Sequence, residues 1–165
     1  AIKIQHVDSN YLLKSSEHKW GNGSSGQQVV TLDTRGDPRK MLWQIREAHN
    51  TTTCVAGVPI KCGEIIRLTH ISTGFKNLHS HRGSPAPLSR YNNEVSGFGD
   101  DGIGDTGDNW KVECLHRKKE GNGEQQLWES ARFVRFLHVD TKRWLAAETK
   151  TKFNQSNCPH CPILG

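Results

Sequence analysis

Residues 136–141 read Phe-Leu-His-Val-Asp-Thr, and two close copies precede them, Leu-Thr-His-Ile-Ser-Thr at 68–73 and Ile-Gln-His-Val-Asp-Ser at 4–9. The histidines of the three copies lie 64 and 68 residues apart, so the phrase marks an internal repeat. In each copy apolar residues alternate around the histidine, a polar cluster interrupts the run, and a second apolar pair follows. This pattern predicts a β-hairpin that occurs three times.

Two further sequence patterns follow each of the first two predicted hairpins. An apolar stretch ends 24 and 25 residues after the histidine, at Val30 and at Val95. A Trp-Xaa-aliphatic stretch comes next, beginning at Trp43 and again at Trp110. Both marks predict additional strands, so the first two repeats each contain a hairpin and two more strands.

The same marks divide the chain into repeats within a single domain spanning 1–165. Repeat one is assigned to 1–62, repeat two to 63–128, and a partial repeat three to 129–165. Counting the same distances from the third histidine puts its last strands at or past the final residue, so we expect repeat three to be incomplete.

The composition narrows the class of protein. The chain has 165 residues, a hydrophobic fraction of 33% and a mean hydropathy of −0.70, which suit one domain with a core of repeated strands. No apolar run is long enough to span a bilayer, and the chain begins directly in a strand without a leader pattern, so we expect a soluble segment. The net charge of +5 comes from short, scattered basic groups, which argues against a nucleic-acid partner.

Five cysteines and three glycosylation sequons favour the secretory pathway. The sequons begin at Asn22, Asn50 and Asn154. We expect a disulfide between Cys114 and either Cys54 or Cys62, because all three lie beside the tryptophan strands. The remaining two cysteines form a Cys-Pro-His-Cys motif at 158–161, whose loop context favours a structural disulfide over a redox pair or half of a zinc site.

The three repeated histidines have apolar neighbours in every copy, so we expect them to be structural, with the imidazole hydrogen-bonded to a nearby carbonyl. The acidic stretch 100–109 resembles a calcium loop but fails the spacing of one, and it is predicted to be a turn before the strand of Trp110. We expect no metal and no cofactor.

The candidate binding site lies in the second hairpin. His79 and His81 are two residues apart, so they point to one face of the expected strand, where they could bind a sugar, a peptide or a metal. The full set of predicted site residues is Leu78, His79, Ser80, His81 and Arg82. The sequence presents no nucleophile–base–acid set and no phosphate loop, so we expect a protein that is not an enzyme.

Several of these motifs together resemble the MIR repeat of protein O-mannosyltransferases and of inositol-trisphosphate and ryanodine receptors. They are Gly26–Val30, Pro59–Gly63, Ile66–His70, Leu78–His81 and Asn93–Gly99. The chain is most similar to the stromal cell-derived factor two family, small soluble proteins of the endoplasmic reticulum lumen. The resemblance implies an all-β fold, a β-trefoil of three MIR repeats.

The resemblance also implies a function. The first expectation is a non-catalytic protein of the endoplasmic reticulum lumen, or a secreted one, which binds a lumenal J-domain co-chaperone, an Hsp70 chaperone and misfolded clients. An alternative is a glycan-binding module linked to protein O-mannosylation, with Trp20 or Tyr91 as the aromatic platform. A third is a segment of a larger membrane transferase.

Overall fold

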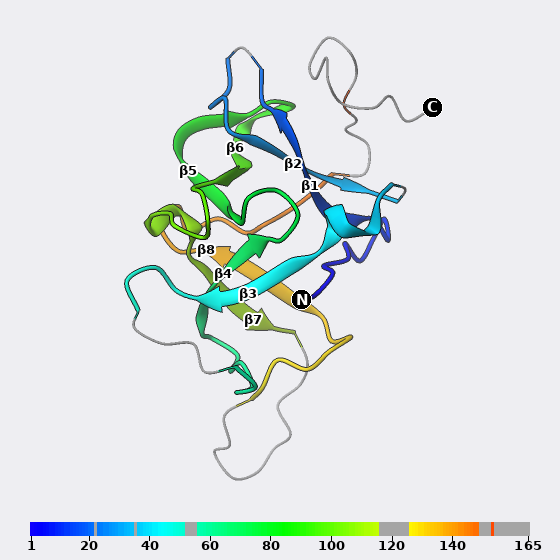
Figure 1. Cartoon of the computed structure of the whole chain (residues 1–165), viewed down its shortest axis with the longest axis vertical. Helices are drawn as coiled ribbons and strands as arrows, with labels where there is room; N and C mark the ends of the chain where they lie inside the picture. The colour runs from blue at the N-terminus through cyan, green and yellow to red at the C-terminus, as the bar shows by residue number, and fades with distance from the viewer. Residues whose placement is uncertain (22, 35, 52–55, 116–125, 149–152, 154–165) are drawn as a thin grey trace.

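The computed structural model describes the whole chain except residues 22, 35, 52–55, 116–125, 149–152 and 154–165 (Figure 1). The described part is all-β, as the sequence predicts. Its strands are β1 (Leu12–Lys19), β2 (Gln28–Asp33), β3 (Trp43–Glu47), β4 (Ile65–His70), β5 (Lys76–Ala86), β6 (Ser89–Phe98), β7 (Trp110–Cys114) and β8 (Val134–His138). Two short 3-10 helices, η1 (Pro38–Met41) and η2 (Thr106–Asp108), precede the two tryptophan strands.

The strands form one antiparallel sheet in the order β1-β2-β6-β5-β4-β7-β8, and β3 pairs with β4. Figure 1 shows the hairpins β1–β2 and β5–β6 at one end and strands β3, β4, β7 and β8 at the other. No helix of the described residues is long and apolar enough to cross a membrane.

Each predicted hairpin has the same turn. The fourth residue after the histidine adopts a positive φ, at Asn10 (59°), Gly74 (68°) and Lys142 (60°). The backbone N–H groups of Asn10 and Lys142 donate to the carbonyl oxygens of His6 and His138, at 2.8 and 3.0 Å. Glycine and asparagine tolerate this left-handed conformation well, and Lys142 adopts it because the surrounding hairpin fixes the turn.

Each tryptophan strand lies between two segments that contain, or directly precede, a copy of the repeated phrase. Trp43 is paired with His70 on one side and with Ile2 on the other. Trp110 is paired in the same register with His138 and with Ile66. We call this arrangement a tryptophan seat, and the described residues form two of them.

The repeated histidines hold these seats together. The rings of His70 and His138 lie 4.8 and 4.7 Å from those of Trp43 and Trp110, between ring centroids. Nε2 of each histidine bonds to a carbonyl oxygen three residues before the tryptophan, and Nδ1 bonds to the threonine three residues after the histidine. The structural role predicted for these two histidines is confirmed.

The tryptophans anchor the main hydrophobic core. Trp43 and Trp110 are 0% and 1% exposed, and their indole N–H groups donate to the carbonyl oxygens of Leu13 and Leu78 at 3.0 and 2.8 Å. A buried tryptophan needs such an acceptor, so each position specifies both packing and a hydrogen bond. The core consists of Leu13, Val30, Trp43, Ile66, Leu68, Leu78, Trp110, Val112 and Phe136.

A disulfide joins Cys62 to Cys114, with the two Cα atoms 5.6 Å apart. This confirms the prediction that Cys114 forms a disulfide, and it identifies Cys62, of the two candidates Cys54 and Cys62, as its partner. The bridge closes a separation of 52 residues and ties the segment before β4 to the end of β7. Cys54, Cys158 and Cys161 lie outside the described residues.

Repeat three contributes β8 and the turn that follows it, where Leu137 is bridged to Trp144. The Cys-Pro-His-Cys motif and most of the chain after Glu148 lie outside the described residues. The repeat boundaries and the incompleteness of repeat three therefore stay predictions.

The two buried histidines predict acid sensitivity. Burial lowers the pKa of His70 and of His138 below the ordinary value of 6.5, although each Nε2–H donates a hydrogen bond to a backbone carbonyl oxygen, which opposes the shift. Because the unfolded chain binds these protons more readily, stability should be fully present above about pH 6.5 and fall as the pH drops below it. The slope should be at most about 1.4 kcal/mol per pH unit for each histidine.

Urea unfolding followed by tryptophan fluorescence between pH 7.5 and 5 checks this expectation. The control variant His49→Ala, at a histidine that is only partly buried, should keep the acid slope. A free energy of unfolding that stays constant or rises as the pH falls would contradict it.

Candidate functional site

The predicted site residues lie on β5, and their side chains alternate between different surroundings. Leu78 is 0% exposed and packs in the core, and its carbonyl oxygen accepts the hydrogen bond from the Trp110 indole. Ser80 is 3% exposed and donates from Oγ to the carbonyl oxygen of Glu94 at 2.7 Å. These two residues therefore support the site from beneath, and its exposed part begins at His81.

His79 is buried and held by a buried carboxylate. Its Nδ1 lies 2.9 Å from Oδ1 of Asp108, whose side chain is fully buried. The other oxygen of Asp108 accepts from Asn77 Nδ2 and from the backbone N–H of Asp105, both at 3.0 Å. A buried carboxylate is stable when its oxygens accept several hydrogen bonds, and here three donors converge on it.

The contacts of His79 continue to the surface in one direction. A carboxylate only accepts, so Nδ1 of His79 carries a hydrogen, and in the neutral imidazole Nε2 is then an acceptor. His79 Nε2 lies 3.2 Å from Nδ1 of His81, and Nε2 of His81 lies 2.7 Å from Oγ of Ser84. This order makes His81 Nδ1 a donor and fixes the Ser84 hydroxyl as a donor to His81. We call the series Ser84–His81–His79–Asp108 the imidazole relay.

Two glycines allow η2 and its preceding loop to approach β5. A Cβ atom at Gly107 would lie 2.4 Å from His79 Cε1 and 2.8 Å from the carbonyl oxygen of Ser80. A Cβ atom at Gly104 would lie 1.7 Å from Oδ2 of Asp108. Both positions therefore require glycine for the loop to deliver Asp108 to His79.

The acidic stretch 100–109 is a turn before β7, as the sequence predicts. Asp105 caps η2, because its side chain accepts from the backbone N–H of Gly107 at 2.8 Å. Ligand atoms of His79, Asp105 and Asp108 lie within 4.8 Å of one another, a spacing that could hold a metal ion. The hydrogen bonds already described satisfy the buried carboxylate, so the geometry is explained without a metal.

The exposed part of the site is cationic. A guanidinium nitrogen of Arg82 lies 3.3 Å from the carbonyl oxygen of Asp140, and Arg143 donates to the carbonyl oxygen of Tyr91. Within the described part of the chain neither arginine forms an ion pair, so both positive charges face solvent. We call His81, Arg82, Tyr91 and Arg143 the arginine patch.

The two aromatic platforms proposed from the sequence differ in accessibility. Tyr91 is 89% exposed, so its ring is available to a ligand. Trp20 is only 5% exposed, donates to the carbonyl oxygen of Val95 at 3.2 Å and packs 5.1 Å from Phe153. Trp20 is therefore part of a small second core and offers no open platform.

Sequence reasoning missed two members of the relay. Asp108 lies 29 residues after His79, and no periodic pattern connects them. The Gly-Xaa-Xaa-Gly spacing of 104–107 just before Asp108 was a usable signal, because it marks a close backbone approach. Ser84 carries no such signal, since it meets His81 only through the irregular end of β5.

The sequence family agrees with this architecture. The family model described as MIR domain matches residues 4–158. The chain therefore belongs to the MIR domain family. Curated relatives are stromal cell-derived factor 2-like proteins: one from Dictyostelium discoideum is 42% identical over 154 residues, covering 92% of this chain and 67% of the relative. Stromal cell-derived factor 2 of Homo sapiens is 43% identical over 141 residues, and these cover 86% of this chain and 60% of the human protein.

Solved structures show the same fold. The crystal structure of the SDF2-like protein from Arabidopsis thaliana has a TM-score of 0.79 at 35% identity, covering 95% of this chain and 80% of that one. A protein O-mannosyltransferase complex of S. cerevisiae bound to the sugar donor has a TM-score of 0.71 at 28% identity, covering 90% of this chain and 20% of that one.

The relay predicts a stability role for Asp108. In Asp108→Asn the side-chain NH2 group faces Nδ2 of Asn77 and the backbone N–H of Asp105, which are both donors. Because these buried donors lose their acceptor, the free energy of unfolding should fall by about 1–3 kcal/mol. The exposed Asp101→Asn is the matched control and should change it little. Urea unfolding at pH 7.5 measures both, and equal effects would contradict the role.

Proposed function

We propose that this chain is a non-catalytic binding module of the endoplasmic reticulum lumen. Its partners are a lumenal J-domain co-chaperone with its Hsp70 chaperone, and misfolded client proteins. The observation that carries the proposal is the arginine patch, two exposed guanidinium groups beside a histidine held in place by a buried relay. The Cys62–Cys114 disulfide supports an oxidising compartment, where such bridges persist.

The patch suits recognition of an acidic surface on another protein. Arginine binds carboxylates in a planar, bidentate geometry, and it is enriched where interfaces bind strongly. The neighbouring contacts restrain both side chains before a partner arrives, which lowers the entropy that binding must remove. Of the predicted residues, His81 and Arg82 would touch the partner, and Leu78, His79 and Ser80 would fix their positions.

Binding of an immobilised lumenal J-domain co-chaperone to the full chain tests this function. The double variant Arg82→Ala with Arg143→Ala should weaken binding about tenfold or more, because it removes both charges. Lys111→Ala removes an exposed positive charge on β7 and should leave binding unchanged. Equal effects of the two changes, or no binding by the unaltered chain, would contradict the proposal.

A second candidate is a glycan-binding module linked to protein O-mannosylation. It is supported by the similarity to the mannosyltransferase complex bound to its sugar donor and by the exposed ring beside the patch. Sugars stack on aromatic faces and hydrogen-bond to paired polar groups, which Tyr91 and His81 provide.

An array of mannosylated glycans and peptides tests this candidate. Tyr91→Ala should abolish binding, because it removes the platform without touching the core. The other exposed aromatic residue Phe133 provides a matched control as Phe133→Ala. An array without signal above background removes the candidate.

A further inference from the structure

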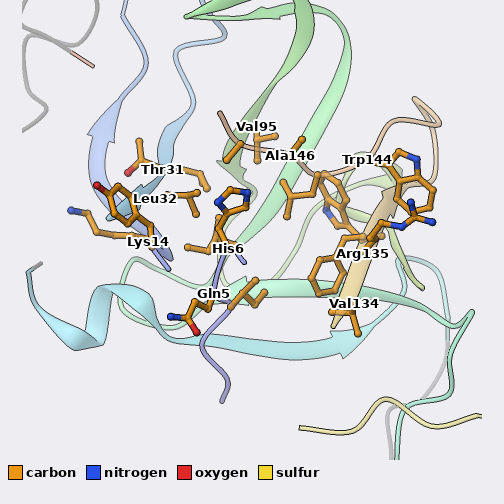
Figure 2. A pocket seen from close by; sticks show the side chains of 18 of the residues that line it. Gln5, His6, Lys14, Thr31, Leu32, Val95, Val134, Arg135, Trp144 and Ala146 are labelled. Atoms are coloured by element: carbon orange, nitrogen blue, oxygen red, sulfur yellow. The ribbon is translucent and has the colours of Figure 1, made fainter. Parts of the chain in front are cut away.

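A depression of about 880 Å³ lies where the hairpin β1–β2 meets the hairpin β5–β6. It is lined by the end of β1, the start of β2, the turn before β5 and the segment after β6. All its lining residues lie between Glu17 and Asp105, in the predicted repeats one and two. The cavity around His6 in Figure 2 is a different one and shares no lining residue with this depression.

A buried amide group lines the depression. The side chain of Gln28 is 5% exposed, and its Nε2 lies 2.7 Å from Oγ of Ser15 and 2.7 Å from Oγ1 of Thr73. The Ser15 hydroxyl donates to a backbone carbonyl oxygen, and the Thr73 hydroxyl donates to Nδ1 of His70, whose Nε2–H is bound to another carbonyl oxygen. Both hydroxyls therefore accept from Gln28, and both of its amide hydrogens are in use.

The oxygen of this amide is left as an acceptor. Oε1 of Gln28 has no hydrogen-bond partner among the described residues. Gly97 lies opposite Gln28 in the β2–β6 pair, and a Cβ atom there would lie 3.1 Å from Nε2 and 3.5 Å from Cδ. Glycine thus leaves the amide uncovered by a side chain at this position. Because an unpaired buried acceptor is costly, the depression favours a ligand that donates a hydrogen bond.

The charged side chains around the depression are mostly acidic, although the whole chain has a net charge of +5. They are Glu17, Asp100 and Asp105 against Lys19 and Lys76. Glu17 is exposed and forms no ion pair within the described part of the chain. Asp100 leans toward the amide, since its Oδ1 would lie 3.1 Å from a Cβ atom at Gly74, the neighbour of Thr73. The ligand that fits best therefore carries a positive charge.

An equivalent joint between hairpins forms the arginine patch, and its charge is the opposite. Four residues after the carbonyl group that accepts the indole N–H, repeat one has Glu17 and repeat two has Arg82. Five residues after the repeated histidine, repeat two has Phe75 and repeat three has Arg143. A carboxylate and an aromatic ring thus replace the two guanidinium groups of the patch, so the two joints suit partner groups of opposite charge.

We propose that this depression binds an arginine side chain of a partner protein. A guanidinium group has several donors and no acceptor, so it can donate to Oε1 of Gln28 and to the carboxylate of Asp100 together. Its planar shape fits over the backbone of Gly97, and it can stack on the half-buried ring of Phe98, which also lines the depression. The site is separate from the arginine patch, so the proposal does not rest on the proposed function.

The peptide acetyl-Gly-Arg-Gly-amide is the probe, and the same peptide with citrulline in place of arginine is its neutral control. Titration of the nitrogen-15-labelled full chain should give saturable NMR shifts at the side-chain amide of Gln28 and the backbone N–H groups of Gly97 and Gly99. The arginine peptide should bind about tenfold more tightly than the citrulline peptide, because only arginine forms charge-assisted hydrogen bonds. Equal binding of the two peptides, shifts confined to other residues, or no saturable binding overturns the proposal.

Protein variants locate the binding. Asp100→Asn should weaken the arginine peptide about threefold, whereas Asp101→Asn, at an exposed neighbour outside the depression, should not. Gln28→Met removes Oε1 at similar length and should abolish saturable binding. If this variant fails to fold, the two aspartate variants decide, and equal effects of these two overturn the proposal. The double variant Arg82→Ala with Arg143→Ala should bind the arginine peptide like the unaltered chain, which separates this test from that of the proposed function.

Discussion

A buried tryptophan packed on the histidine of the following repeat is the interaction on which this protein depends. Trp43 on His70 and Trp110 on His138 each connect three segments, because the strand pairs on both sides and the indole N–H reaches a third strand. One side chain thus supplies apolar burial, a ring contact and a hydrogen bond. Replacing the histidine with an apolar residue would remove the donor to a backbone carbonyl oxygen and one partner of the threonine hydroxyl, which explains why a polar ring recurs at this buried position.

The imidazole relay connects this framework to the protein surface. The indole of Trp110 binds the carbonyl oxygen of Leu78, and Asp108, two residues before that tryptophan, binds His79 on the same strand. The seat and the relay therefore share β5 and the loop that enters β7. Because a buried carboxylate tolerates little rearrangement, the half-buried His81 is held in a fixed position. A binding surface built in this way is rigid although it lies at a strand end.

Much of the fold followed from patterns of period two and from repeated spacing. Alternation around the three histidines located β1, β4, β5 and β8, although the segment around His6 forms an isolated bridge at Gln5 and no strand. The Trp-Xaa-aliphatic pattern located β3 and β7. The site was predicted less well. Alternation correctly put His79 and His81 on one face, but it could not show that His79 is buried, because β5 is covered on both sides over its first residues. The partners Ser84 and Asp108 escaped prediction because contacts between irregular segments leave no period in the sequence.

The sequence by itself determined the all-β class, most of the strands between Leu12 and His138, and the structural role of His70 and His138. These properties are local or periodic, so residue order is enough to express them. Only the tertiary structure decided that Cys62 is the partner of Cys114 and that Asp108 closes the relay. Each of these contacts joins segments that are far apart in the sequence. Long-range packing and hydrogen bonding determine such contacts, and local conformational preference does not.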